Sequence, residues 1–198
     1  MSFSCIKKAF DVSRRPLILI LVLGLAIRLI LAPLLTCEVD LAYWMRITGL
    51  LDAGFTLYDT SGYYYTPVWG YIVSIFSSLG SILGISDIGT FIPDIISSRT
   101  SSFYNSEYVV SIGYAVMMKL PLIITDVVTA FLIYDLVKSV TDDSKKAMYA
   151  FGLWFLCPLV IMVSSSHGMF DNVSTMLIVL TVSLAFRRHY FFAGVAFA

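Results

Sequence analysis

Apolar positions in this chain come in long runs and not in the alternation that is typical of strands. The first run extends from Leu17 to Leu35, and further runs cover 120–137, 149–163 and 173–186, with another beginning near Phe191. A helix needs about 20 apolar residues to cross a bilayer, whereas the strands of membrane barrels alternate apolar and polar positions. The pattern therefore predicts an all-α, polytopic transmembrane protein.

Residues 67–119 fit this pattern less well. Residues 67–85 can form a span, residues 86–107 are polar, and residues 108–120 offer only a short apolar return. We expect short, broken or re-entrant helices here, and a turn at Pro121 on the outer side before the next span.

Basic residues predict the orientation of the spans. The residues Lys7, Lys8, Arg14 and Arg15 precede the first apolar run. Two further clusters are Lys138 with Lys145 and Lys146, and Arg187 with Arg188. By the positive-inside rule these segments face the cytoplasm. The N-terminus is then cytoplasmic, and residues 36–55 and 164–172 are extracytoplasmic, in a prokaryotic plasma membrane or in the endoplasmic reticulum of a eukaryote.

The first outer segment, "LLTCEVDLAYWMRITGLLDAG", has a helical period. Its mostly apolar face repeats every 3.6 residues and consists of Leu41, Trp44, Met45, Thr48 and Leu51. The opposite face consists of Tyr43, Arg46 and Gly49. Gly54 is the predicted C-cap of this helix. This predicts a short amphipathic helix in the headgroup plane. Asp40 stands at its start, either as an N-cap or as a residue with a chemical role.

Composition supports the membrane assignment and narrows the partners. The chain has 198 residues, of which 59% are hydrophobic and only 13% charged, unlike a soluble domain. Thirteen basic and thirteen acidic residues, with no basic block, give no indication of a nucleic-acid partner. The cysteines Cys5, Cys37 and Cys157 are odd in number and far apart, which favours reduced thiols over a metal site.

Charged residues inside the apolar runs are candidates for function. Arg28 and Asp126 would lie at similar depths, about 10 Å and about 7–8 Å below the outer face, and could pair. The pair could fix helix packing or shape the inner end of a pocket. In "HGMFDN", His167 and Asp171 are four residues apart and could line one helix face, although Asp171 could equally cap the next span. One His and one Asp are too few for a zinc site.

Four blocks occur in the order found in GT-C glycosyltransferases: "RLILAPLLTCEVDLAYW", "YYYTPVWGYI", "KLPLIITDVVTAFLIYDLV" and "WFLCPLVIMVSSSHGMFDNVSTMLIVLTVSLAFRRHYFFAG". Over residues 26–74 and 117–197 the chain resembles the branch that contains the catalytic subunit of the first GPI mannosyltransferase and its archaeal and bacterial relatives. The chain stops within the apolar run "YFFAGVAFA". The resemblance therefore implies that 1–198 is one transmembrane domain, the N-terminal half of a longer GT-C enzyme.

The resemblance implies inverting transfer of a sugar, with mannose favoured. The donor would be a polyprenyl phosphate such as dolichyl phosphate, and the acceptor a lipid- or protein-linked hydroxyl on the extracytoplasmic side. Asp40 corresponds to the catalytic base, with Glu38 beside it. Substrate contacts would come from basic, acidic and aromatic residues: Arg28, Arg46, Tyr65, Lys119, Asp126, His167 and Asp171. Met169 stands where the family has Gln or Asn.

Some members of this family use a divalent metal, Mg or Mn, and others use none; Asp40 and Glu38 would hold it. Two rival functions stay open. A transporter or channel subunit would use Arg28 and Asp126 as pathway charges, although it predicts inverted repeats that the sequence lacks. A non-catalytic assembly subunit would keep the GT-C module without its chemistry.

Overall fold

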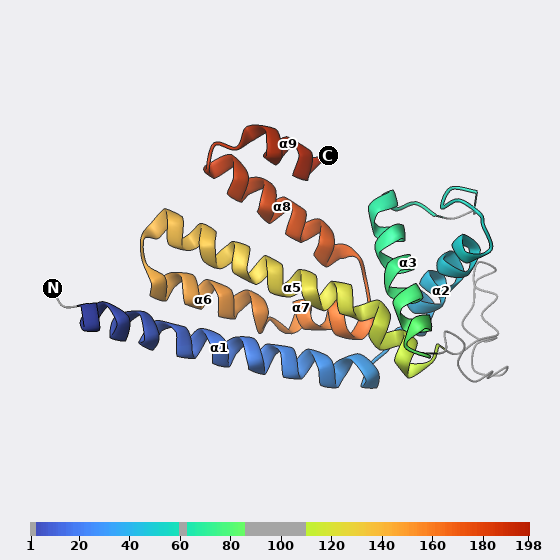
Figure 1. Ribbon diagram of the computed structural model, residues 1–198, viewed down its shortest axis with the longest axis horizontal. Helices are drawn as coiled ribbons and strands as arrows, with labels where there is room; N and C mark the ends of the chain where they lie inside the picture. Colours follow the sequence, from blue (N-terminus) through green and yellow to red (C-terminus); the bar gives the residue numbers. More distant parts are fainter. Residues whose placement is uncertain (1–2, 60–62, 86–109) are drawn as a thin grey trace. The chain divides into compact units, whose positions relative to one another are not determined.

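The computed structural model describes residues 3–59, 63–85 and 110–198, without the side chains of residues 3–14, 38 and 39 (Figure 1). Within these ranges the chain is helical and contains no strand, so the predicted all-α class is confirmed. The helices are α1 (Phe3–Leu34), α2 (Glu38–Asp52), α3 (Pro67–Ile82), α5 (Ile112–Thr141), α6 (Ser144–Phe155), α7 (Pro158–Ile161), the π-helix η1 (Met162–His167), α8 (Asp171–Phe186) and α9 (Tyr190–Phe197).

Two helices in the described part of the chain are long and apolar enough to cross a membrane. They are α1, over Arg15–Leu34, and α5. A third crossing is possible if α6 and the segment Pro158–His167 form one span, bent by 47° where Pro158 opens α7. The helices α3 and α8 have 16 residues each, fewer than the about 20 that a span needs. Their assignment as full spans is not supported by their length.

The expected turn at Pro121 is wrong, because α5 continues through this proline as one helix of 30 residues. A proline removes one backbone donor, and membrane helices tolerate this loss when nearby groups satisfy the freed carbonyl. The correction changes the depth of Asp126. This residue lies 14 positions after Ile112, or about 21 Å along the helix, and not close to its outer end.

The chain divides into two compact units that are described separately. The first unit contains Met1–Arg28, Ile123–Ser164 and Asp171–Ala198. The second unit contains Leu29–Leu122 and Ser165–Phe170.

The core of the first unit lies where α1, α5 and α6 meet. Ala130, Phe151 and Phe155 are completely buried there, and apolar residues from all three helices surround them, namely Leu17, Ile20, Leu21, Leu25, Val127, Tyr134 and Trp154. A Cβ on Gly24 would lie 2.5 Å from the Phe155 ring, so α1 and α6 approach each other closely at this glycine.

One end of the first unit gathers the two turns that carry basic residues. In Figure 1 the turns α5–α6 and α8–α9 lie at the same end as the start of α1. An exposed ion pair between Arg187 and Asp135 links the end of α8 to α5. At the other turn Asp143 caps α6, and hydrogen bonds from the backbone N–H groups of Lys145 and Lys146 lower the pKa of its carboxyl. The basic clusters therefore share one end, as the orientation prediction requires.

The second unit is built around α2 and α3. The face of α2 predicted to be apolar is buried at Leu41, Trp44 and Thr48, while Arg46 and Gly49 are exposed. This face packs against protein: the Trp44 and Trp69 rings meet edge to face at 5.6 Å. Its predicted place in the headgroup plane stays a prediction.

The end of α2 and the start of α3 both follow signals in the sequence. Gly54 has φ +89° just after the C-cap residue Ala53, and the N–H groups of Gly54 and Phe55 bond to the carbonyls of Leu51 and Leu50. This is a Schellman motif, which confirms the glycine termination of α2. The helix α3 begins at Pro67, the first residue of the predicted segment 67–85.

Candidate functional site

A fully buried ion pair joins α1 and α5 in the first unit. The Nε of Arg28 donates to the Oδ2 of Asp126 at 2.8 Å, and both side chains are 0% exposed. The guanidinium also bonds through Nη1 to the carbonyls of Gly24, at 3.2 Å, and Phe155, at 2.7 Å. Its Cζ lies 4.3 Å from the centroid of the Phe155 ring. The predicted pairing is confirmed.

The second oxygen of Asp126 is satisfied by a residue that sequence reasoning missed. The side-chain amide of Asn172 donates to Asp126 Oδ1 at 2.5 Å from the first turn of α8. No local pattern in the sequence marks Asn172 as buried. Arg28, Asp126 and Asn172 thus form a polar network in which only Arg28 Nη2 lacks a partner among the described residues. This network favours a packing role over a charge lining a pathway.

Lys119 closes the C-terminal end of α1 in the second unit. Its side chain is 0% exposed. The ammonium donates to the carbonyls of Ala32, at 2.7 Å, and Leu35, at 2.6 Å, and to the hydroxyl of Thr36, at 3.1 Å. An ammonium has three protons, so these acceptors use its full capacity. The positive charge is also favourable at the negative end of a helix. Lys119 therefore has a structural role, because all three protons of its ammonium bind acceptors at the end of α1 and in the loop after it.

Asp40 lies in the first turn of α2, directly after the loop that follows α1. The N-cap of α2 is Cys37 and the helix begins at Glu38, so the interpretation of Asp40 as the N-cap is wrong. The helix begins three residues before Leu41, the first position of the apolar period. Asp40 is half-buried, and its carboxylate has no hydrogen bond or ion pair with the described side chains. The side chain of Glu38 lies outside the described residues.

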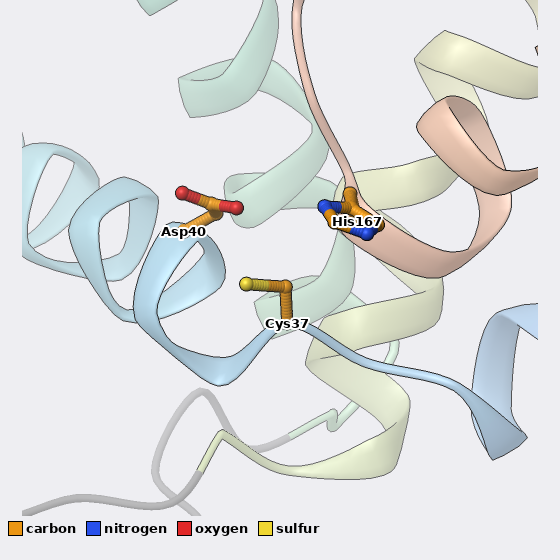
Figure 2. Close-up of side chains that lie close together, drawn as sticks. All are labelled: Cys37, Asp40 and His167. Atoms are coloured by element: carbon orange, nitrogen blue, oxygen red, sulfur yellow. The ribbon is translucent and has the colours of Figure 1, made fainter. Parts of the chain in front are cut away.

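Three potential ligands converge beside the start of α2. The Sγ of Cys37, a carboxylate oxygen of Asp40 and a ring nitrogen of His167 all lie within 4.8 Å of one another. Figure 2 shows Cys37 and Asp40 at the start of α2, and His167 reaching toward them from the last position of η1. His167 is exposed, and the other two side chains are half-buried. Sequence reasoning missed Cys37 as a member of this group.

Two hydrogen bonds fix the His167 segment against α2. The backbone N–H of Cys37 donates to the carbonyl of Ser166 at 3.2 Å, and the indole Nε1 of Trp44 donates to the carbonyl of Gly168 at 3.3 Å. Gly168 has φ +76°, a left-handed conformation that suits glycine. The residues on both sides of His167 are therefore tied to the helix that carries Asp40.

An aromatic cluster completes this anchoring. Phe170 meets the rings of Tyr65 and Trp69 at 5.8 and 5.3 Å, and Tyr65 also lies 5.1 Å from Trp44. The predicted substrate residue Tyr65 therefore takes part in packing. Arg46 is exposed on α2, and Met169 is half-buried.

His167 and Asp171 do not share a helix face. η1 ends at His167, residues 168–170 are not helical, and α8 begins at Asp171, which is exposed. Asp171 is thus the first residue of α8, where a carboxylate is favourable at the positive end of the helix. Asp126 and Asp171 belong to the first unit, and Asp40 and His167 to the second. Their convergence on one outer site stays a prediction.

Fold and composition together define an all-helical chain, within the described residues, with helices suited to a membrane. Comparison with protein-family models, curated proteins and solved structures finds no match.

Proposed function

We propose that this protein is a polytopic membrane glycosyltransferase of the GT-C type, which transfers mannose from a polyprenyl-phosphate donor to an acceptor hydroxyl on the extracytoplasmic side. Two things support the proposal. The first is the ordered resemblance in sequence. The second, which carries it, is the Asp40 carboxylate: it is half-buried, lacks a partner among the described side chains, and follows directly on the end of the apolar helix α1.

The chemistry follows from this carboxylate. Asp40 takes the proton from the acceptor hydroxyl while the hydroxyl oxygen attacks the anomeric carbon of the donor. The bond from that carbon to the phosphate oxygen breaks, and the electron pair leaves with the polyprenyl phosphate. Attack from the face opposite the leaving group inverts the anomeric centre.

The departing phosphate needs a partner for its developing charge. Lys119 already uses its three protons on other acceptors, and Arg28 has only Nη2 without a partner among the described groups. His167 is exposed and close to Asp40. We therefore assign the phosphate contact to His167. Neither rival function is favoured by a specific observation.

The test compares two aspartates on the same helix. Asp40→Asn removes the base, and we expect transfer of radiolabelled mannose from polyprenyl phosphate to fall about 10²–10⁴-fold. Asp52→Asn, at the other, exposed end of α2, should leave the rate unchanged. The assay uses membranes from cells that express the complete protein. A folded Asp40→Asn variant with normal transfer would remove Asp40 from the mechanism, and wild-type membranes no more active than membranes without the protein would refute the activity itself.

A further inference from the structure

We infer that Cys37, Asp40 and His167 form a binding site for a zinc-class transition-metal ion. The three side chains supply sulfur, oxygen and nitrogen, and their ligand atoms lie within 4.8 Å of one another. Thiolate and imidazole select zinc and related ions, whereas Mg²⁺ and Mn²⁺ prefer oxygen ligands. The donor set therefore differs from the Mg or Mn site that a pair of acidic residues would form.

The separations suit closure around such an ion. Zinc bonds of about 2.3 Å to sulfur and about 2.0–2.1 Å to nitrogen or oxygen place tetrahedral ligand atoms about 3.3–3.6 Å apart. The widest separation allowed here, 4.8 Å, exceeds this by about 1.2–1.5 Å. Rotation of the exposed His167 side chain can make up this difference. Three protein ligands leave the fourth position of a tetrahedral ion open.

The fold holds these ligands in place. The bonds from Cys37 N to Ser166 O and from Trp44 Nε1 to Gly168 O tie both neighbours of His167 to the start of α2. Cys37 is the N-cap residue of this helix. On binding, the ion takes the place of the thiol proton, which passes to solvent.

This inference rests on the geometry of the second unit and not on sugar transfer. An Asp40 that coordinates a metal is not available as a base, so the proposed transfer belongs to the metal-free form. Metal binding is measured directly, and its failure would leave the assignment of Asp40 as a base untouched.

The experiment uses the purified, metal-stripped protein in detergent with Co²⁺ as the spectroscopic probe and Zn²⁺ as the competitor. We expect one Co²⁺ per chain with a thiolate-to-cobalt charge-transfer band, displaced by stoichiometric Zn²⁺ and not by excess Mg²⁺. Cys37→Ser should abolish the band. Loss of a residue that only hydrogen-bonds to a metal ligand weakens metal binding about 10–100-fold. His167→Ala removes a ligand itself, so it should weaken Zn²⁺ binding by at least as much.

Matched controls use a cysteine and a histidine of the first unit. Cys157→Ser and His189→Ala should leave the band and the Zn²⁺ affinity unchanged, since neither residue belongs to the three-ligand group. His167 is exposed, so we expect His167→Ala to remain folded. The inference is overturned if wild-type protein binds Zn²⁺ no more tightly than His167→Ala, or if Mg²⁺ displaces Co²⁺ as readily as Zn²⁺ does.

Discussion

Two aspartates on α5 occupy opposite environments and show what burial does to a single charge. Asp126 is 0% exposed and shares its oxygens between Arg28 and Asn172. Asp135 lies nine residues further along, is 50% exposed, and pairs with Arg187 at the surface. Removing one partner of a buried pair leaves the other charge without compensation, whereas exposed pairs contribute little.

Asp126→Asn should therefore lower the free energy of unfolding by about 3–5 kcal/mol. Asp135→Asn should change it by no more than about 1 kcal/mol. Thermal and denaturant unfolding in one detergent measures both. Replacing the whole pair, as Arg28→Met with Asp126→Leu, should recover most of the loss. Equal, small effects of the two asparagine variants would contradict the structural role of the Arg28–Asp126 pair.

At the scale of elements, one lysine links the ends of two helices. Lys119 belongs to α5, yet its ammonium donates to one carbonyl near the end of α1 and to two groups of the loop that leads into α2. The position of the Cys37 and Asp40 side chains therefore depends on a residue about 80 positions further along the chain, as the separation of 83 between Lys119 and Thr36 indicates.

Lys119→Met should destabilise the protein by about 1–3 kcal/mol, because it leaves buried acceptors without a donor. Lys138→Met, at an exposed position in the last turn of the same helix, should stay within about 0.5 kcal/mol of wild type. Denaturant midpoints of the two variants in detergent give the comparison. A midpoint for Lys119→Met that equals that of Lys138→Met would show that the three hydrogen bonds do not hold the end of α1.

Elements with a local signal could be predicted from sequence, and those that depend on distant partners could not. The apolar period and Gly54 predict α2 and its end, and Pro67 predicts the start of α3. Pro121 predicts a break that is absent, because the surrounding packing outweighs the local preference of proline. The pairing of Arg28 with Asp126 follows from the cost of isolated charges. The approach of Cys37 to His167 needs the tertiary contact through Ser166, which no local pattern encodes.

At the scale of the whole molecule, the distribution of basic residues predicts which parts face the cytoplasm. The α5–α6 turn, which precedes Lys145 in the first turn of α6, and the α8–α9 turn, which contains Arg188, lie at one end of the first unit. The ion pair between Asp135 and Arg187 links α5 to the end of α8. The proposed function requires Asp40 and His167 to face the opposite side of the membrane.

Single cysteines introduced at positions 145, 167 and 188, with Cys5, Cys37 and Cys157 replaced by serine, test this orientation. In intact cells an impermeant thiol reagent should label position 167, while positions 145 and 188 should react only after permeabilisation. Labelling of position 167 only after permeabilisation would place the candidate site on the wrong side for a donor that is extracytoplasmic.

The Arg28–Asp126 pair also has a consequence for the time course of synthesis. Asp126 lies 98 residues after Arg28, and Phe155, whose carbonyl also accepts from the guanidinium, lies 127 residues after it. A ribosome that adds about 5–20 residues per second needs about 5–20 s to reach Asp126. During this interval an arginine at the centre of a membrane helix costs about 2.5–3.5 kcal/mol. The cell's insertion machinery must therefore hold the newly made α1, or let its arginine reach water, until α5 emerges.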